Sequence, residues 1–426
     1  MAEKTGPTRR QFLAGASAAA ATAFAANFPQ VARGKVIGAN DRIGVGYIGC
    51  GGRSHSHMHS VHYLKDQKKE NIALVAFNDV YKPRLDRCAA AWKGKPYRDY
   101  RELLADPNVD LVCISTPDHH HPYAVADAAK AGKDIYCEKP FTHWRQFEQL
   151  KMAVKAVKDA KVVFQLGTQG MSDGAWHEAR KLILQGVIGK PIHAECGMFR
   201  DSDGGERGMP IDDRNAKPGP DLDWEQFQGD APKKEFTVKR FFQWRLYNDY
   251  SGGPVTDVYP HCFTPVAYMM DAGFPQYVMA AGGIHRWPER DVPDSFNVYA
   301  DYARKMTCCI LGTFASGYNG GDGCRGSGAR SPVVRGYDGA LIFKGKQIEF
   351  VPNHGKKAAA FPIPYGENQV DHWAKLIACC RQRDLNTFSP IQLAYEVQTT
   401  MIMAYWSWKD RKVARFDPQT EQIVMG

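Results

Sequence analysis

The 426-residue chain lacks several features that would place it outside ordinary globular proteins. It has no uncharged apolar run of the roughly 18 residues that a membrane-spanning helix needs. It also lacks a run of five or more positive residues, although its formal net charge is +9, so charge gives no reason to expect a nucleic-acid partner. Hydrophobic residues make up 44% and charged residues 24%, which excludes a largely disordered chain, a collagen and a coiled coil.

Cysteine pairs at metal-ligand or disulfide-framework spacing are also missing. The 11 cysteines are odd in number and include no CxxC pair. Cys113 and Cys137 lie inside apolar runs, where cysteine behaves as a small buried hydrophobe. We therefore expect neither a full disulfide framework nor a structural zinc site, and a chain that folds in a reducing compartment.

The N-terminus carries the pattern of an export signal. Thr8–Leu13 (TRRQFL) is a twin-arginine motif, and the uncharged, alanine-rich stretch Leu13–Ala26 follows it. Ala23–Ala25 offers an A-x-A cleavage site. We expect residues 1–33 to be a twin-arginine signal peptide and leader, and the mature protein to be periplasmic or otherwise extracytoplasmic, without stable membrane insertion. The alternative is a mobile N-terminal tail.

Residues 34–167 have the pattern of a dinucleotide-binding domain. The β-rich run Ile43–Ile48 leads into the glycine turn Gly49–Ser54, and a helical stretch follows from about residue 56 to 65. A strand, a glycine turn and a helix in this order allow a pyrophosphate to bind at the helix N-terminus.

Asp79 predicts which dinucleotide binds. It follows the next strand, Ile72–Phe77, and lies 30 residues after Gly49. An acid at the end of this strand accepts both ribose hydroxyls of NAD and repels the 2′-phosphate of NADP, so we expect NAD. The other interpretation of Asp79 is a helix N-cap.

Further strands alternate with helices in this region. The predicted strands are Val109–Ser115, Ile135–Cys137 and Val162–Leu166. This alternation predicts a Rossmann-type, doubly wound parallel sheet, in which ligands bind at the carboxyl ends of the strands.

Residues 168–426 differ in kind. Predicted strands follow one another without helices between them, at Tyr277–Ile284, Phe296–Tyr302 and Met306–Phe314, so we expect a C-terminal α/β domain with an open, mostly antiparallel sheet. Before them, residues 200–248 form a long segment rich in glycine, proline and charge, of the kind that serves as a binding loop or an interface arm.

Four motifs in this order resemble the glucose–fructose oxidoreductase / inositol dehydrogenase (Gfo/Idh/MocA) family. They are the glycine turn, Thr116–His121 (TPDHHH), Glu138–Pro140 (EKP) and Asp257–His261 (DVYPH), and the resemblance covers about residues 40–426. Leu222–Glu225 and Tyr250–Pro254 resemble an exported, sugar-related subset.

The resemblance implies a nicotinamide cofactor, a sugar or polyol substrate and a homo-oligomer built on the open sheet. By motif match it implies that Lys139 is the catalytic lysine, and that Asp257 and His261 are the catalytic acid–base pair. With the glycine turn and Asp79, the expected NAD-binding residues are Gly49, Gly51, Gly52, Arg53, Asp79, Thr116, Pro117, His121, Glu138 and Lys139. No metal is assigned.

These residue types suit the oxidation of a secondary alcohol. Histidine supplies a base with a pKa near neutrality, and an ammonium such as that of Lys139 stabilises a developing alkoxide. The spacing of Asp257 and His261 places both on one helix face, but Pro260 lies between them. Either the helix kinks there, or Asp257 is an N-cap and Pro260 belongs to the first turn. A structural role for His261 is the alternative.

Three classes of function stay open. The first is an NAD-dependent oxidoreductase that acts on a sugar, polyol or glycoside, with a cofactor that is tightly bound and recycled in place. The second is an NAD-dependent, redox-neutral glycoside hydrolase or lyase. The third is a cofactor-binding protein without catalysis. His55, His59 and His62 share a spacing that suggests a metal site, but a polar helix face explains them better.

Overall fold

A six-stranded parallel sheet forms the core of the first half of the chain. The computed structural model describes residues 41–319, 323–325 and 329–426, so the expected signal and leader at 1–33 lie outside the described residues. The strand order is β3-β2-β1-β4-β5-β6, with every neighbouring pair parallel. The strands are β1 (Ile43–Ile48), β2 (Ile72–Asn78), β3 (Lys95–Tyr97), β4 (Leu111–Ile114), β5 (Asp134–Glu138) and β6 (Phe164–Gly167). The predicted doubly wound parallel sheet is confirmed.

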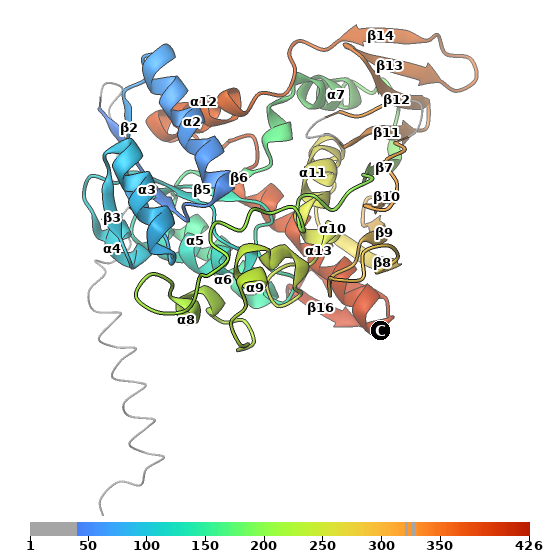
Figure 1. Ribbon diagram of the computed structural model, residues 1–426. Coiled ribbons are helices and arrows are strands. Elements are labelled where there is room, and N and C mark those ends of the chain that lie inside the picture. The colour runs from blue at the N-terminus through green and yellow to red at the C-terminus, as the bar shows by residue number, and fades with distance from the viewer. Residues whose placement is uncertain (1–40, 320–322, 326–328) are drawn as a thin grey trace, which may run out of the picture.

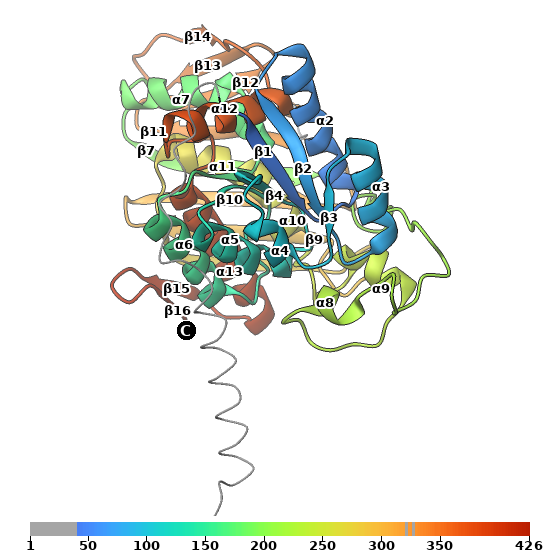
Figure 2. The same ribbon diagram turned by 90° about the vertical axis from the view of Figure 1, so that its left-hand side faces the viewer.

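Helices cover both faces of this sheet (Figure 2). Leu111 and Cys113 of β4 belong to one core cluster and Val112 and Ile114 to another, because successive side chains of a strand point to opposite faces. The first face is covered by α2 (Gly52–Gln67), α3 (Lys82–Trp92) and α12 (Gln369–Gln382). The second is covered by α4 (Tyr100–Ala105), α5 (His121–Lys130) and α6 (Phe147–Ala160).

A ten-stranded sheet forms the second half. Its order is β14-β13-β12-β11-β7-β10-β9-β8-β15-β16. Among the described strands of this sheet, only β7 and β10 pair in parallel, so the predicted open, mostly antiparallel sheet is confirmed. The strands are β7 (Pro191–Phe199), β8 (Pro275–Gly283), β9 (Ser295–Tyr302), β10 (Met306–Thr313), β11 (Arg330–Gly336), β12 (Gly339–Lys344), β13 (Gln347–Pro352), β14 (Ala359–Pro362), β15 (Ala414–Asp417) and β16 (Gln422–Met425).

The two faces of the large sheet have different surroundings. Helices α7 (Gly174–Leu184), α11 (Tyr259–Met270) and α13 (Ile391–Asp410) share one hydrophobic core with one face and lie between the two sheets (Figure 1). On the other face Met279 and Tyr299 are cross-strand partners and are 51% and 54% exposed. Over the described residues, no helix combines the length and apolar character needed to cross a bilayer.

Residues 200–248, here called the cover segment, fold against the first sheet rather than away from it. The segment contains α8 (Trp224–Gln228), α9 (Val238–Phe242) and the short helix η3 (Trp244–Leu246). Leu222 forms a β-bridge with Tyr81, just beyond the end of β2, and the amide of Lys82 donates to the carbonyl of Asp221. Aromatic residues on the segment pack around Tyr81 in a separate core cluster, so the segment is fixed at the carboxyl end of the parallel sheet.

Helix α12 lies late in the chain but packs against α2 of the first half (Figure 1). The indole nitrogen of Trp373 donates to Nδ1 of His57 at 3.0 Å, and Nη1 of Arg53 donates to Gln369 at 3.0 Å. Trp373 also stacks on Tyr136 of β5 with an interplanar angle of 6°. The two halves therefore share side-chain contacts in addition to their chain connection.

Candidate active site

The glycine turn between β1 and α2 leaves room for a phosphate group. Gly49 has φ +92°, and a Cβ there would lie 2.7 Å from the carbonyl oxygen of Ser115, so only glycine fits. At Gly51 a Cβ would lie 3.6 Å from Nη1 of Arg84, and at Gly52 a Cβ would meet nothing within 4 Å. No side chain caps the N-terminus of α2. The first amides of this helix therefore face open space, as a pyrophosphate requires.

Asp79 lies at the carboxyl end of β2 and lines the same cavity. Its Oδ2 accepts from the amide of Cys50 at 2.7 Å, and its Oδ1 accepts from the amide of Tyr81 at 2.8 Å. Helix α3 begins at Lys82 with Tyr81 at its N-cap, so Asp79 is not the cap of that helix. A carboxylate has about four acceptor positions, so both oxygens can still bind ribose hydroxyls.

Arg84 lies near Asp79 but is already bound by another acid. Its guanidinium donates to both oxygens of Asp212 on the cover segment, at 2.8 and 3.0 Å. An arginine at this place can accommodate the 2′-phosphate of NADP, but this one is held by a two-point carboxylate pair. The acid at the end of β2 and the occupied arginine together suit NAD.

Arg53 and Glu138 connect α2 with the end of β5. Nε of Arg53 lies 2.6 Å from Oε1 of Glu138, which also lies 2.8 Å from Nε2 of His57. Burial alone would raise the pKa of Glu138, but Arg53 and His57 hold it well below its usual range, so the carboxyl stays ionised. Arg53 and Glu138 both line the cavity, whereas His57 is fully buried behind them.

The residues after β4 take two different positions. Thr116 and Pro117 line the cavity, and Oγ1 of Thr116 is buried without a hydrogen-bond partner among the described residues. His121 lies behind them, with its ring nitrogens 2.7 Å from the carbonyl of Pro140 and 2.9 Å from that of Thr116. Burial lowers the pKa of His121 to about 4, so the neutral ring donates to one carbonyl at a time. His121 thus joins two loops and does not line the cavity.

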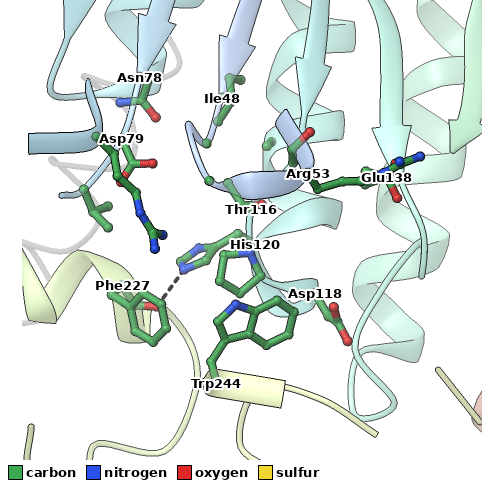
Figure 3. Close-up of a pocket in the computed structure, with 18 of the residues that line it drawn as sticks. Ile48, Arg53, Asn78, Asp79, Thr116, Asp118, His120, Glu138, Phe227 and Trp244 are labelled. Atoms are coloured by element: carbon green, nitrogen blue, oxygen red, sulfur yellow. Dashed lines mark hydrogen bonds and ion pairs between the residues drawn. The ribbon is translucent and has the colours of Figure 1, made fainter. Parts of the chain in front are cut away.

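The cavity has a volume of about 700 Å³ and lies between the carboxyl ends of the parallel strands and the cover segment (Figure 3). The segment contributes a third of its wall, including Met209, Phe227, Asp230, Phe242, Trp244 and Arg245. Nε2 of His119 and of His120 lie 2.8 and 2.7 Å from the carbonyl oxygen of Phe227, which fastens the segment to the loop after β4. A dinucleotide bound here would be enclosed on both sides.

Lys139, Asp257 and Arg245 meet at one end of this cavity. Nζ of Lys139 donates to Oδ1 of Asp257 at 2.7 Å and to its carbonyl oxygen at 2.7 Å. Nε of Arg245 lies 3.2 Å from the same Oδ1. Burial alone would raise the pKa of Asp257, but Lys139 and Arg245 hold it well below its usual range. Asp257 is therefore a fixed carboxylate and positions the two cations.

His261 lies beside this cluster as a neutral imidazole, with a pKa below that of the near-neutral base expected from the sequence. It is 9% exposed, and Nδ1 has no partner among the described residues. Burial and the nearby Lys139 charge lower the pKa of His261 to about 3, so the imidazole is neutral near pH 7. No hydrogen bond joins Asp257 to His261 among the described residues. Oδ1 of Asp257 is instead in contact with Lys139 and Arg245.

The backbone around these two residues differs from a single helix. Asp257 is the last residue of α10 (Pro254–Asp257), Val258 separates the two helices, and His261 lies in the first turn of α11. Pro260 belongs to that turn, where the missing N–H leaves no hydrogen bond unmade. The N-cap of α11 is Val258, so Asp257 is not the cap. Asp257 and His261 lie on two successive helices and do not share one helix face.

The other histidines of the first half have structural surroundings. His59 and His62 each contact the edge of Trp92, and His55 lies 3.9 Å from the thiol of Cys88. Within the described ranges, no set of three or more His, Cys, Asp or Glu side chains is arranged to hold a metal ion. A polar helix face describes only part of this helix, because His57 is buried and bonded to Glu138.

The cavity residues that the sequence analysis did not single out include Asp118, Trp244 and Arg245. Asp118 lies inside the TPDHHH motif, but only Thr116, Pro117 and His121 of that motif were expected to bind the cofactor. Trp244 and Arg245 belong to the cover segment, and the guanidinium of Arg245 lies 4.6 Å over the Trp244 ring. Aromatic clustering in that segment was visible in the sequence, but its position over the cofactor cavity depends on the tertiary fold.

Comparison with known proteins places both halves in one family. The model of an oxidoreductase family with an NAD-binding Rossmann fold matches residues 43–168, and the model of that family's C-terminal alpha/beta domain matches residues 174–426. The chain is 37% identical over 133 residues to the NAD(+)-dependent scyllo-inositol 2-dehydrogenase of Bacillus subtilis, which is 30% of this chain and 37% of that protein. It is 33% identical over 126 residues to levoglucosan dehydrogenase of Pseudarthrobacter phenanthrenivorans, which is 30% of this chain and 29% of that protein. The chain thus spans about a third of the length of these curated relatives.

Solved structures share the fold over nearly their whole length. Levoglucosan dehydrogenase in complex with NADH and levoglucosan matches with a TM-score of 0.66 at 17% identity, covering 88% of this chain and 99% of that one. The WlbA dehydrogenase of Bordetella pertussis, in complex with NADH and UDP-GlcNAcA, matches with a TM-score of 0.65 at 18% identity, with the same coverage. The sequence motifs, the cavity and the two family matches together show that this chain belongs to the Gfo/Idh/MocA oxidoreductase family, with an NAD-binding Rossmann fold followed by a C-terminal α/β domain.

Proposed function

We propose that the protein oxidises a CH–OH group of a sugar, polyol or glycoside by hydride transfer to NAD. The observation that carries this proposal is that Lys139 lines a cavity whose other parts suit a dinucleotide, is bonded there to Asp257, and has the neutral His261 nearby. The dehydrogenases that the chain resembles act on inositol and levoglucosan, which are carbohydrate-type alcohols. Aromatic residues of the cover segment add an apolar wall of the kind that binds sugar rings.

The roles of the side chains follow from their charges. The chemistry that bound NAD supplies is acceptance of a hydride from the carbon that bears the hydroxyl. Two of the three Nζ protons of Lys139 are held by Asp257, which leaves one for the substrate oxygen. Neutral His261 accepts the hydroxyl proton, and Asp257, which also contacts Arg245, keeps the ammonium in place.

The enclosed cavity supports a cofactor that stays bound between turnovers. A nanomolar dissociation constant corresponds to roughly 12 kcal/mol of binding free energy. The open N-terminus of α2, Asp79 and the cover segment would share this interaction. A retained cofactor has to be reoxidised in place, either by a second carbonyl substrate or by return of the hydride to the same substrate, as in a redox-neutral cleavage.

Two further properties belong to the proposal. The twin-arginine pattern at Arg9 and Arg10 suggests export of the folded, cofactor-loaded protein, which suits a compartment where free NAD is scarce. The exposed apolar side chains on the open face of the large sheet, among them Met279 and Tyr299, suggest a homo-oligomer.

The test begins with protein purified without added cofactor. After gel filtration and denaturation, the supernatant is analysed by mass spectrometry for NAD and NADP. The native protein is then incubated with scyllo-inositol, levoglucosan and a panel of hexoses and glycosides while NADH absorbance is followed. Bound NAD and conversion of a carbohydrate are expected. Protein that emerges empty and converts none of these compounds, even with added NAD, would overturn the proposal.

A further inference from the structure

Asp118 is a buried acid that faces the cavity and that neither the cofactor cradle nor the proposed hydride transfer uses. It begins the short helix η1 (Asp118–His120) after β4, is 1% exposed, and lines the cavity together with Lys139 and Arg245. Figure 3 shows its side chain on the same side of the cavity as Trp244.

The carboxyl of Asp118 is not satisfied by the protein around it. Its Oδ2 is buried and has no hydrogen-bond partner among the described residues. The charged groups nearby are Lys139, Arg245 and Asp257, and the thiol of Cys137 also lies close. Both cations are already in contact with Oδ1 of Asp257, at 2.7 and 3.2 Å.

This arrangement decides the protonation state of Asp118. Burial raises its pKa well above the usual range, Arg245 and Lys139 lower it, and the carboxylate of Asp257 raises it again. An ionised carboxylate with an unpartnered buried oxygen would be strongly unfavourable, whereas a neutral carboxyl avoids most of that cost. Burial therefore favours the protonated form of Asp118.

A neutral carboxyl is both a donor and an acceptor. Its O–H needs an acceptor and its C=O accepts a donor, a pairing that a hydroxyl group matches with its own two functions. Since the protein offers Oδ2 no partner, the ligand in the cavity has to supply one. Asp118 also lies beside the lysine that contacts the reacting oxygen, so its partner is expected close to the reacting carbon.

We propose that Asp118 is a substrate-binding residue whose buried, unpartnered carboxyl oxygen binds a second hydroxyl of the carbohydrate, next to the one that is oxidised. This inference rests on the proposed function and adds a specificity-determining contact to it. The site then selects polyols with two neighbouring hydroxyls over alcohols with a single one.

The experiment compares Asp118→Ala and Asp118→Asn with the wild type, with Asp159→Asn, at an exposed aspartate, as the matched control. Melting temperature and NAD content verify that each variant is folded and loaded. With scyllo-inositol, levoglucosan or the carbohydrate found in the panel as substrate, Asp118→Ala is expected to raise KM about tenfold or more with little change in kcat. Asp118→Asn retains a donor and an acceptor, so its KM stays near that of the wild type at neutral pH.

The pH profile gives a readout that a structural role would not change. When alkaline pH removes the proton of Asp118, a second negative charge appears beside Asp257, so the KM of the wild type rises there and that of Asp118→Asn does not. Infrared difference spectra of substrate-free wild type against Asp118→Asn should contain the carbonyl band of a protonated carboxylic acid.

The outcomes separate this inference from the proposed function. If the wild type neither binds nor converts any carbohydrate, the proposed function is wrong, and the proposed contact of Asp118 is wrong with it. A working wild type with an unchanged KM in Asp118→Ala, a loss confined to kcat, a loss of NAD instead of sugar binding, or a missing carboxylic-acid band would each overturn the role of Asp118 alone.

Discussion

Lys139 and Asp257 join the two halves of the molecule through a doubled contact. Nζ of Lys139, just after β5, lies 2.7 Å from both the carboxylate and the backbone carbonyl of Asp257, at the end of α10. The two contacts thereby fix the position and direction of the ammonium. Because one partner is a main-chain atom, the position of the lysine depends on the break between α10 and α11 as much as on the side chain of Asp257.

Removing the ammonium should abolish most of the turnover. Lys139→Ala is expected to lower kcat by roughly 10²–10⁴-fold, the span for a positioned acid–base group, and His261→Ala should do the same. NAD content should largely survive in both, which a mass-spectrometric assay of the denatured protein will measure. Lys155→Ala, at an exposed lysine, is the control. Near-normal turnover in a folded variant would remove that residue from the mechanism.

Replacing the acid at the end of β2 should weaken and broaden dinucleotide binding. Asp79→Ala removes the acceptor for the ribose hydroxyls and also frees the amides of Cys50 and Tyr81. We expect a loss of about 1–3 kcal/mol in NAD binding and weaker discrimination against NADP. Calorimetric titration of cofactor-stripped protein will measure both. A wild type that prefers NADP would show that the reasoning from Asp79 and the occupied Arg84 is wrong.

Loosening the cover segment should speed the release of NAD. Asp212→Ala removes the partner of Arg84 and of Arg87, two of the contacts that hold the segment against α3. The expected increase in the dissociation rate is roughly fivefold to thirtyfold, which corresponds to about 1–2 kcal/mol for a charge-assisted pair. Release can be followed by dialysis or by competition with a labelled dinucleotide. If Asp212→Ala and the surface control Asp159→Ala release NAD equally slowly, the segment does not retain the cofactor.

Buried histidines should make the protein lose stability as the pH falls below 6.5. Burial lowers the pKa of His372 to about 3, His143 and His261 to about 3, and His121 to about 4, against an ordinary value of 6.5. Below pH 6.5 the unfolded chain therefore binds protons that the folded one does not, and the free energy of unfolding decreases. Each such histidine is expected to cost about 2 kcal/mol between about pH 7.5 and about pH 5.

Denaturant unfolding at a series of pH values measures this slope. His372→Asn removes one of the buried imidazoles and should flatten the slope, whatever it does to the absolute stability. The exposed His285→Asn controls for the loss of an imidazole. A stability that stays constant down to about pH 5 would contradict the neutral state of these four rings.

Export should depend on the arginine pair at the N-terminus. Changing both Arg9 and Arg10 to lysine removes the feature by which the twin-arginine route is recognised. We expect the variant to stay in the cytoplasm as a folded, NAD-loaded protein, as cell fractionation and cofactor analysis would show. Unchanged export would mean that another route, or another signal, is used.

The sequence predicted the elements of the parallel sheet because hydrophobic runs fix them locally. Ile43–Ile48 is a strand with the bounds that were expected, since it is apolar on both faces and ends in glycine. The edge strand Lys95–Tyr97 was missed because it has only three residues, of which two are exposed. Strands β13 and β14, the last two at one end of the large sheet, were missed as well.

The site was predictable only where a motif is contiguous. Lys139, Asp257 and His261 were singled out from their motifs; in the structure Lys139 lines the cavity and is bonded to Asp257, and its charge lowers the pKa of His261. Arg245 was missed because nothing local shows that a segment after β7 returns to the end of β5. The relation of Asp257 to His261 was misread for a similar reason, since a helix-spacing rule does not show that Val258 interrupts the helix.

The late position of α12 in the sequence determines when one face of the parallel sheet can be covered during synthesis. Trp373 covers the face of the parallel sheet near Tyr136, so this face stays uncovered on the ribosome until most of the chain has been made. Arg53, whose partners include Gln369, also waits for that helix. We therefore expect dinucleotide binding to be completed only after α12 has been made, late in biosynthesis.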